Sequence, residues 1–89
     1  GRAKSALPVL EKARSVDFGD TRVLRDLAVA YAKTNQTGMA ALVTAERYAL
    51  QGQIGDALLH SKRAEALLPK GSAPWKRAMD IQNRAASHK

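Results

Sequence analysis

The fold is decided by residues 45–69, AERYALQGQIGDALLHSKRAEALLP. Gly52 allows the positive φ with which many helices end, and Pro69 stops a second helix because it lacks a backbone N–H. Between them, the apolar residues recur at i, i+3, i+4, i+10, i+13 and i+14, which places them on one helical face. They are Ile54, Ala57, Leu58, Ala64, Leu67 and Leu68. This pattern predicts two helices joined by a tight turn at Gly52.

The sequence also repeats itself at an offset of 17 residues. When residues 27–42 are laid over residues 44–59, seven of the sixteen pairs are identical. The identical pairs are Ala28/Ala45, Tyr31/Tyr48, Ala32/Ala49, Gln36/Gln53, Gly38/Gly55, Ala40/Ala57 and Leu42/Leu59. Self-similarity at a fixed period is typical of helical solenoids. We therefore expect each helix with its turn to be one repeating element.

These small and aromatic positions resemble the tetratricopeptide (TPR) helix–turn–helix, whose period of about 34 residues is twice the offset found here. Alanines would let neighbouring helices approach closely, and a tyrosine would fill the space between them. The matching structural positions are Ala28, Tyr31, Ala45, Tyr48, Gly52, Ala57, Ala64, Pro69 and Trp75. The resemblance implies an all-α, TPR-like right-handed solenoid of about five antiparallel helices, with residues 1–89 forming a single domain. The third helix would then be the second helix of one unit and the first of the next.

Helix start and stop signals place the five helices along the chain. The predicted spans are residues 6–16, 21–34, 39–51, 54–68 and 73–87. Ser5 is expected to cap the first helix, with Pro8 in its first turn, where a missing N–H costs nothing. Asp20 and Ser72 are expected to cap the second and fifth helices. Asn35 is expected to end the second helix in the left-handed conformation.

Composition limits the class of protein. With 89 residues, 4% aromatics and a predominance of alanine, leucine and long polar residues, the chain suits one small helical domain. There is no cysteine, so disulfide and thiolate chemistry are excluded. No run reaches the about 20 apolar residues of a membrane span. Because the chain starts at Gly1 without a methionine, we expect it to be a fragment of a longer protein.

The net charge of +7 leaves two interpretations open. An acidic or polyanionic partner is one, and an ordinary basic surface is the other, since the cations are spread along the whole chain. A small basic helical nucleic-acid-binding domain is the alternative function, because two predicted helices carry clusters of bases. These are Arg22, Arg25 and Lys33 on one helix, and Lys76, Arg77 and Arg84 on another. Few Asn, Gln or Ser residues stand beside these basic residues. A nucleic-acid-binding domain of this kind would also not explain the 17-residue repeat.

The sequence contains no group of residues with the spacing of a catalytic or metal-binding motif. The two histidines, His60 and His88, are far apart, and no His-Glu-x-x-His occurs. The run Gly52-Gln-Ile-Gly55 is not a phosphate loop because no Lys-Ser/Thr follows it. We therefore predict no catalytic residue, no metal ligand and no cofactor, so that this fragment is not itself an enzyme.

In TPR proteins the first helices of the units line a concave surface that holds a peptide or a partner helix. By residue match, that surface would show Arg22, Arg25, Val29 and Lys33 from the second helix, Leu42, Glu46 and Ala49 from the third, and Lys76 and Asp80 from the fifth. Some family members clamp a peptide's terminal carboxylate with Lys and Asn, but Val29 stands where the Asn is expected. The resemblance therefore implies a peptide or protein partner, without implying a chaperone C-terminal peptide. The alternative is that these residues are ordinary solvated charges.

A longer resemblance covers roughly Leu24–Ile81. It rests on Glu46-Arg-Tyr-Ala-Leu-Gln-Gly through Ala57, and on Ala64-Glu-Ala-Leu-Leu-Pro-Lys-Gly-Ser-Ala-Pro-Trp-Lys-Arg-Ala-Met-Asp-Ile81. It is similar to the C-terminal TPR region of bacterial periplasmic zinc metalloproteases of the β-barrel-assembly-enhancing type. The catalytic motif of that family is absent here, so no proteolytic role passes to any residue of the chain. The resemblance implies a periplasmic, substrate- or partner-binding domain. Its partner would be a substrate, its own protease domain or an outer-membrane assembly component.

Overall fold

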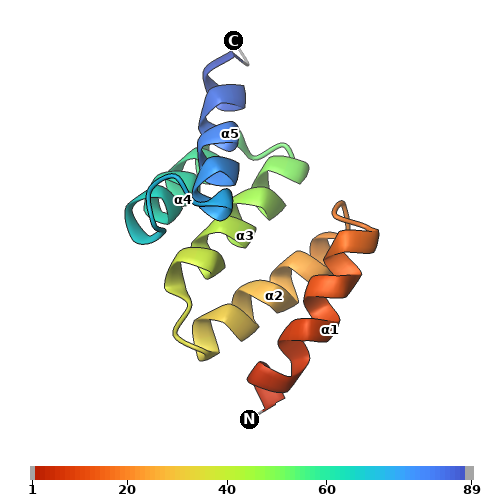
Figure 1. Cartoon of the computed structure of the whole chain (residues 1–89). Coiled ribbons are helices and arrows are strands. Elements are labelled where there is room, and N and C mark those ends of the chain that lie inside the picture. The colour runs from red at the N-terminus through yellow and green to blue at the C-terminus, as the bar shows by residue number, and fades with distance from the viewer. Residues whose placement is uncertain (1, 88–89) are drawn as a thin grey trace.

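The computed structural model describes residues 2–87, which contain five α-helices and no β-strand (Figure 1). The helices are α1 (Arg2–Val16), α2 (Thr21–Lys33), α3 (Thr37–Leu50), α4 (Ile54–Leu67) and α5 (Ala73–Ser87). The expected all-α class and the number of helices are confirmed for this part of the chain. His88, considered above as a metal ligand, lies outside the described residues.

The start of α1 differs from the prediction. The helix begins by Arg2, so Ser5 lies within it and is not its N-cap, and Pro8 lies in its interior beyond the first turn. Pro8 removes one helical hydrogen bond, but it is exposed while its neighbour Leu7 is buried. Ala3 and Leu7 both pack on the core formed with α2. This packing stabilises the turn upstream of Pro8, which the predicted span of residues 6–16 leaves out of the helix.

The predicted N-caps of α2 and α5 are confirmed, whereas α3 begins at Thr37, two residues before its predicted start. The carboxylate of Asp20 accepts the N–H of Arg22 at 3.0 Å, and this bond lowers the pKa of Asp20. The hydroxyl of Ser72 accepts the N–H of Trp75 at 3.3 Å, in the first turn of α5. Satisfying these otherwise unpaired N–H groups is why such residues precede helices.

The 17-residue repeat extends to the backbone geometry of two turns. Asn35 and Gly52 have φ angles of 62° and 77°. Following them, the N–H of Gln36 donates to the carbonyl of Tyr31 at 2.8 Å, and the N–H of Gln53 donates to that of Tyr48 at 2.9 Å. Both are Schellman motifs, in which the left-handed residue returns the chain onto the helix end. The α2–α3 and α3–α4 connections are therefore equivalent, as the sequence predicts.

Two hydrophobic clusters meet at α3, which lies in the middle of the chain's helices (Figure 1). The first, between α1, α2 and α3, contains Leu7, Leu24, Leu27, Ala30, Tyr31 and Val43. The second, between α3, α4 and α5, contains Leu42, Ala45, Ala57, Ala64, Ala78 and Ile81. Each helix packs on the next, and α3 also packs on α5. The four alanines of the second cluster are at most 1% exposed, so small residues lie where these helices approach, as predicted.

The two repeated tyrosines lie differently in this core. Tyr31 is 4% exposed, and its hydroxyl donates to Glu11 at 2.6 Å. Tyr48 packs beside the second cluster while remaining partly exposed. Its ring stacks on His60, with centroids 5.4 Å apart, and the Arg47 guanidinium lies 5.2 Å from its centroid. Neither tyrosine points freely into solvent.

Candidate functional site

The basic residues proposed for partner binding lie on exposed helical surfaces. The side chain of Arg22 is 80% exposed and pairs with Asp20 at 3.5 Å, and that of Arg25 is 60% exposed and pairs with Asp26 at 3.7 Å. Pairs this exposed contribute little stability. Lys33 and Lys76 are exposed as well, on α2 and α5. All four side chains are accessible, but nothing in their geometry brings them together into one site.

The remaining predicted binding residues have three different environments. Leu42 is 0% exposed and belongs to the second cluster, so its assignment as an apolar contact for a partner is wrong. The error arose because a helix packed on two sides buries residues that a helix with one free face would expose. Val29 is 50% exposed. Glu46 is accessible only in part, with 17% of its side chain exposed.

An open cleft of about 520 Å³ lies between the end of α1, the end of α3 and the middle of α5. Its base contains Ala49, Ala57 and Ile81. Phe18, from the loop after α1, and Leu50, at the end of α3, line it while remaining 69% and 48% exposed. Exposed large apolar side chains gathered in a concavity are typical of binding sites. This cleft is therefore the candidate functional site.

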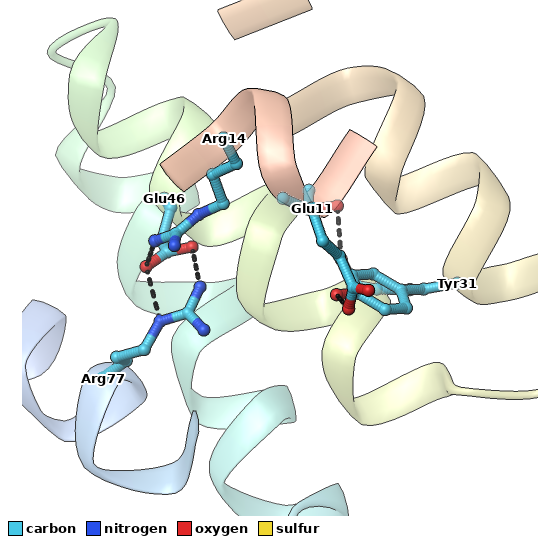
Figure 2. A network of polar contacts seen from close by, with 7 residues as sticks. Glu11, Arg14, Tyr31, Glu46 and Arg77 are labelled. Atoms are coloured by element: carbon cyan, nitrogen blue, oxygen red, sulfur yellow. Dashed lines mark hydrogen bonds and ion pairs between the residues drawn. The ribbon is translucent and has the colours of Figure 1, made fainter. Parts of the chain in front are cut away.

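Glu46 fixes the charged wall of the cleft (Figure 2). One carboxylate oxygen accepts from Arg14 Nη2 at 3.1 Å and from Arg77 Nε at 3.1 Å, and the other accepts from Arg77 Nη2 at 2.6 Å. Charge-assisted bonds with this bidentate geometry are among the strongest in proteins. They join α1, α3 and α5 through one carboxylate, although α1 and α3 have no close backbone contact among the described residues.

The cleft keeps a positive balance after this pairing. Arg14, Arg77 and Arg84 line it together with Glu46 and Asp80, so three cations face two acids. The Nε atom of Arg14 is buried and makes no hydrogen bond within the described residues, so it is closed to a ligand. The exposed parts of the Arg14 and Arg77 side chains, 27% and 32% of their surfaces, are held in place by Glu46, so a carboxylate that enters the cleft could pair with them at a lower ordering cost than flexible side chains would require.

The sequence analysis did not predict Arg14, Phe18 or Leu50 as site residues, and it named Arg77 only for the nucleic-acid alternative. Phe18 carried a usable signal, because a large aromatic side chain directly precedes the turn residues Gly19 and Asp20. The pairing of the two arginines with Glu46 carried no local signal, since Arg14 and Glu46 are 32 positions apart and Arg77 and Glu46 are 31 apart. Of the residues predicted for the concave face, Glu46, Ala49 and Asp80 do line the cleft.

Nowhere in residues 2–87 do three or more His, Asp or Glu side chains gather in a way that could hold a metal ion. In the same part of the chain, no helix is both long and apolar enough to cross a membrane.

Fold and site together define a small all-helical protein with an open, arginine-walled cleft. No protein-family model matches this chain, and comparisons with curated proteins and with solved structures find no match either.

Proposed function

We propose that this chain is a non-catalytic, TPR-type protein-interaction module that binds a peptide or protein segment in the cleft between α1, α3 and α5. The observation that supports it most is the exposure of Phe18 and Leu50 inside a concavity walled by arginines. Apolar anchors with a few placed charges are what peptide-binding sites generally use. The favoured ligand is a segment with one or two large apolar residues beside an acidic residue, since the cleft has an excess of cations.

The proposal includes a TPR-like right-handed stack of antiparallel helices. It is supported by the equivalent Schellman turns after α2 and α3, and by the buried alanines between α3, α4 and α5. The contact of α3 with α5 and the shared carboxylate of Glu46 also agree with α1, α3 and α5 lining one face. In this arrangement, α2 belongs to the other layer, so its basic residues Arg22, Arg25 and Lys33 lie away from the ligand.

A display selection of random peptides against the 89-residue chain tests the binding function. Enriched sequences should combine aromatic or leucine residues with Asp or Glu, and the amide signals around Phe18 and Leu50 should shift in NMR spectra. Leu50→Ser should weaken binding at least about tenfold, because apolar anchors dominate such affinities. Leu59 is the matched control, since it is 49% exposed against 48% for Leu50 and does not line the cleft. Equal loss in Leu59→Ser and Leu50→Ser would exclude the cleft.

The nucleic-acid alternative is favoured by the charge of +7 and by the exposed basic residues of α2 and α5. It predicts an affinity for DNA or RNA that falls steeply with salt, because phosphate binding releases counterions. Mobility-shift assays at two salt concentrations separate it from peptide binding, whose apolar contribution depends little on salt.

We further propose that the module serves a periplasmic zinc-dependent protease, as its substrate- or partner-binding domain. The support is the sequence resemblance over roughly residues 24–81. Determining the gene sequence upstream of the codon for Gly1 tests this association directly. A His-Glu-x-x-His motif encoded there would support it, and a complete upstream reading frame without such a motif would refute it.

A further inference from the structure

A second groove lies on another part of the surface, between α2 and α4 and over α3. It has a volume of about 430 Å³ and does not share a lining residue with the cleft. Within the described chain, no Cα atom of α2 lies within 8 Å of one in α4. The strip of α3 between them, which includes Ala40, Ala41 and Thr44, is therefore only partly covered by the two helices.

The α2 wall of this groove is apolar, and the α4 wall is mixed. Ala28, Val29 and Ala32 line it from α2, and Leu67 lines it from α4 together with His60 and Arg63. Val29 and Leu67 are 50% and 56% exposed, which is unusual for large apolar side chains that line one concavity. Small residues along the walls allow a backbone to approach closely. The α3 residues that line it, Thr37, Ala40, Ala41 and Thr44, share one face of that helix, so the groove runs along α3 and offers a surface against which another helix can pack.

The groove has one sign of charge. His60 and Arg63, both on α4, are the ionisable residues that line it, and no acidic side chain does. Arg63 is exposed and forms no ion pair among the described residues. His60 is held by its stack on Tyr48. An occupant that places a carboxylate beside Arg63 while covering Val29 and Leu67 would complement both the charge and the apolar surface.

We infer that this groove is a docking site for a partner's amphipathic helix, which lays about two turns of apolar side chains between α2 and α4 and pairs an acidic residue with Arg63. The groove spans residues 37–44 of α3, a rise of about 10 Å, which sets the length of the contact. A contact this short is weak by itself. Because the two sites share no residue, the module can hold a helix here while a peptide occupies the cleft, whether or not the cleft binds as proposed.

The test uses two synthetic helical peptides of about 15 residues, long enough to form a helix in water. Both carry a leucine stripe at i, i+3, i+4 and i+7, and they differ only in a flanking Glu or Lys. With the 89-residue chain, the Glu peptide should shift the amide signals of Val29, Ala32, Thr44 and Leu67 in NMR titrations. It should bind more tightly than the Lys peptide.

Two variants and one control variant make the test specific. Arg63→Glu should reverse the preference between the peptides, by about tenfold overall if the charges meet directly. Leu67→Ser should weaken both peptides, whereas Leu59→Ser, at a residue of α4 that is 49% exposed and lies outside the groove, should weaken neither. Circular dichroism of each variant confirms that the helices are retained.

Three outcomes would overturn the inference. One is the absence of binding by either peptide at about 1 mM, the upper limit of a useful affinity. Another is a set of shifts that centres on Phe18 and Leu50, which would place the helix in the cleft instead. The third is self-association of the free chain that Leu67→Ser abolishes, which would make a second copy the occupant. If the cleft binds no peptide, the shifts expected at the groove, the preference for the Glu peptide and the effects of the variants remain as predicted, so the two proposals fail independently.

Discussion

Gly38 and Gly55 are the sharpest test of the packing, because they are equivalent in the sequence repeat and different in the structure. Each is the second residue of its helix, and neither has a positive φ. A Cβ added at Gly55 would meet nothing within 4 Å. A Cβ added at Gly38 would lie 2.9 Å and 3.0 Å from two side-chain atoms of Leu68, and 3.2 Å from the carbonyl carbon of Leu67.

These distances give opposite signs for the same substitution. Gly→Ala in a helix stabilises by up to about 0.5–1 kcal/mol through backbone entropy, and Gly55→Ala should show that gain. At Gly38 the end of the Leu68 side chain can rotate away, but the backbone of Leu67 cannot. Overpacking of this kind costs about 1–3 kcal/mol. The net effect of Gly38→Ala should therefore be a loss of about 0.5–2 kcal/mol.

Urea denaturation followed by circular dichroism measures both effects. For a domain of this size the free energy of unfolding changes by about 1 kcal/mol per molar urea. The midpoint should consequently fall by about 0.5–2 M in Gly38→Ala and rise by up to about 1 M in Gly55→Ala. An equal rise in the two variants would refute the close approach of α3 to the end of α4, and with it the packing of the second cluster.

Three further predictions concern the core and the ring stack. Ala57→Leu should cost about 1–3 kcal/mol by overpacking a site that is 1% exposed, and an unchanged urea midpoint would contradict this. Tyr31→Phe should cost about 0.5–1.5 kcal/mol because it removes the bond to Glu11; Tyr48→Phe, whose hydroxyl has no such partner in the described residues, should cost less. Burial, aided by Arg63, lowers the pKa of His60 below its ordinary 6.5, so the unfolded chain takes up the proton more readily. His60 therefore does not lower the free energy of unfolding above pH 6.5, and it lowers that free energy as the pH falls from 6.5 toward the depressed pKa of His60. A difference in free energy of unfolding between wild type and His60→Phe that stays constant from pH 8 to pH 5 would contradict the shift.

The helix ends show how far local reasoning reaches. The N-caps predicted at Asp20 and Ser72 and the left-handed helix ends predicted at Asn35 and Gly52 are all present in the structure. They could be predicted because a cap or a Schellman turn is made by residues within five positions of one another. The start of α1 was predicted wrongly for the complementary reason. Ser5 and Pro8 give a strong local signal for a helix start, but packing of Leu7 on the first cluster outweighs it.

The candidate site depends on contacts that no local pattern encodes. Glu46 was predicted as a surface contact, yet it is the acceptor that holds Arg14 and Arg77 in the cleft wall. Leu42 was predicted to face a partner, yet α5 and α4 cover it in the second cluster. In both cases the residue was placed on the correct helix, and the neighbours that pack against that helix decided what the side chain touches.

By itself, the sequence determined the all-helical class, the five helices and the repeated turn after α2 and α3, since propensity, capping and periodicity act over a few residues. Only the tertiary structure decided which copy of a repeated residue is buried. Gly38 lies against α4 while Gly55 faces open space, and Tyr31 is buried while Tyr48 stays partly exposed. The repeat gives the two copies the same local conformation. The helices on either side of each copy differ, and that difference sets the packing, the cleft and the groove.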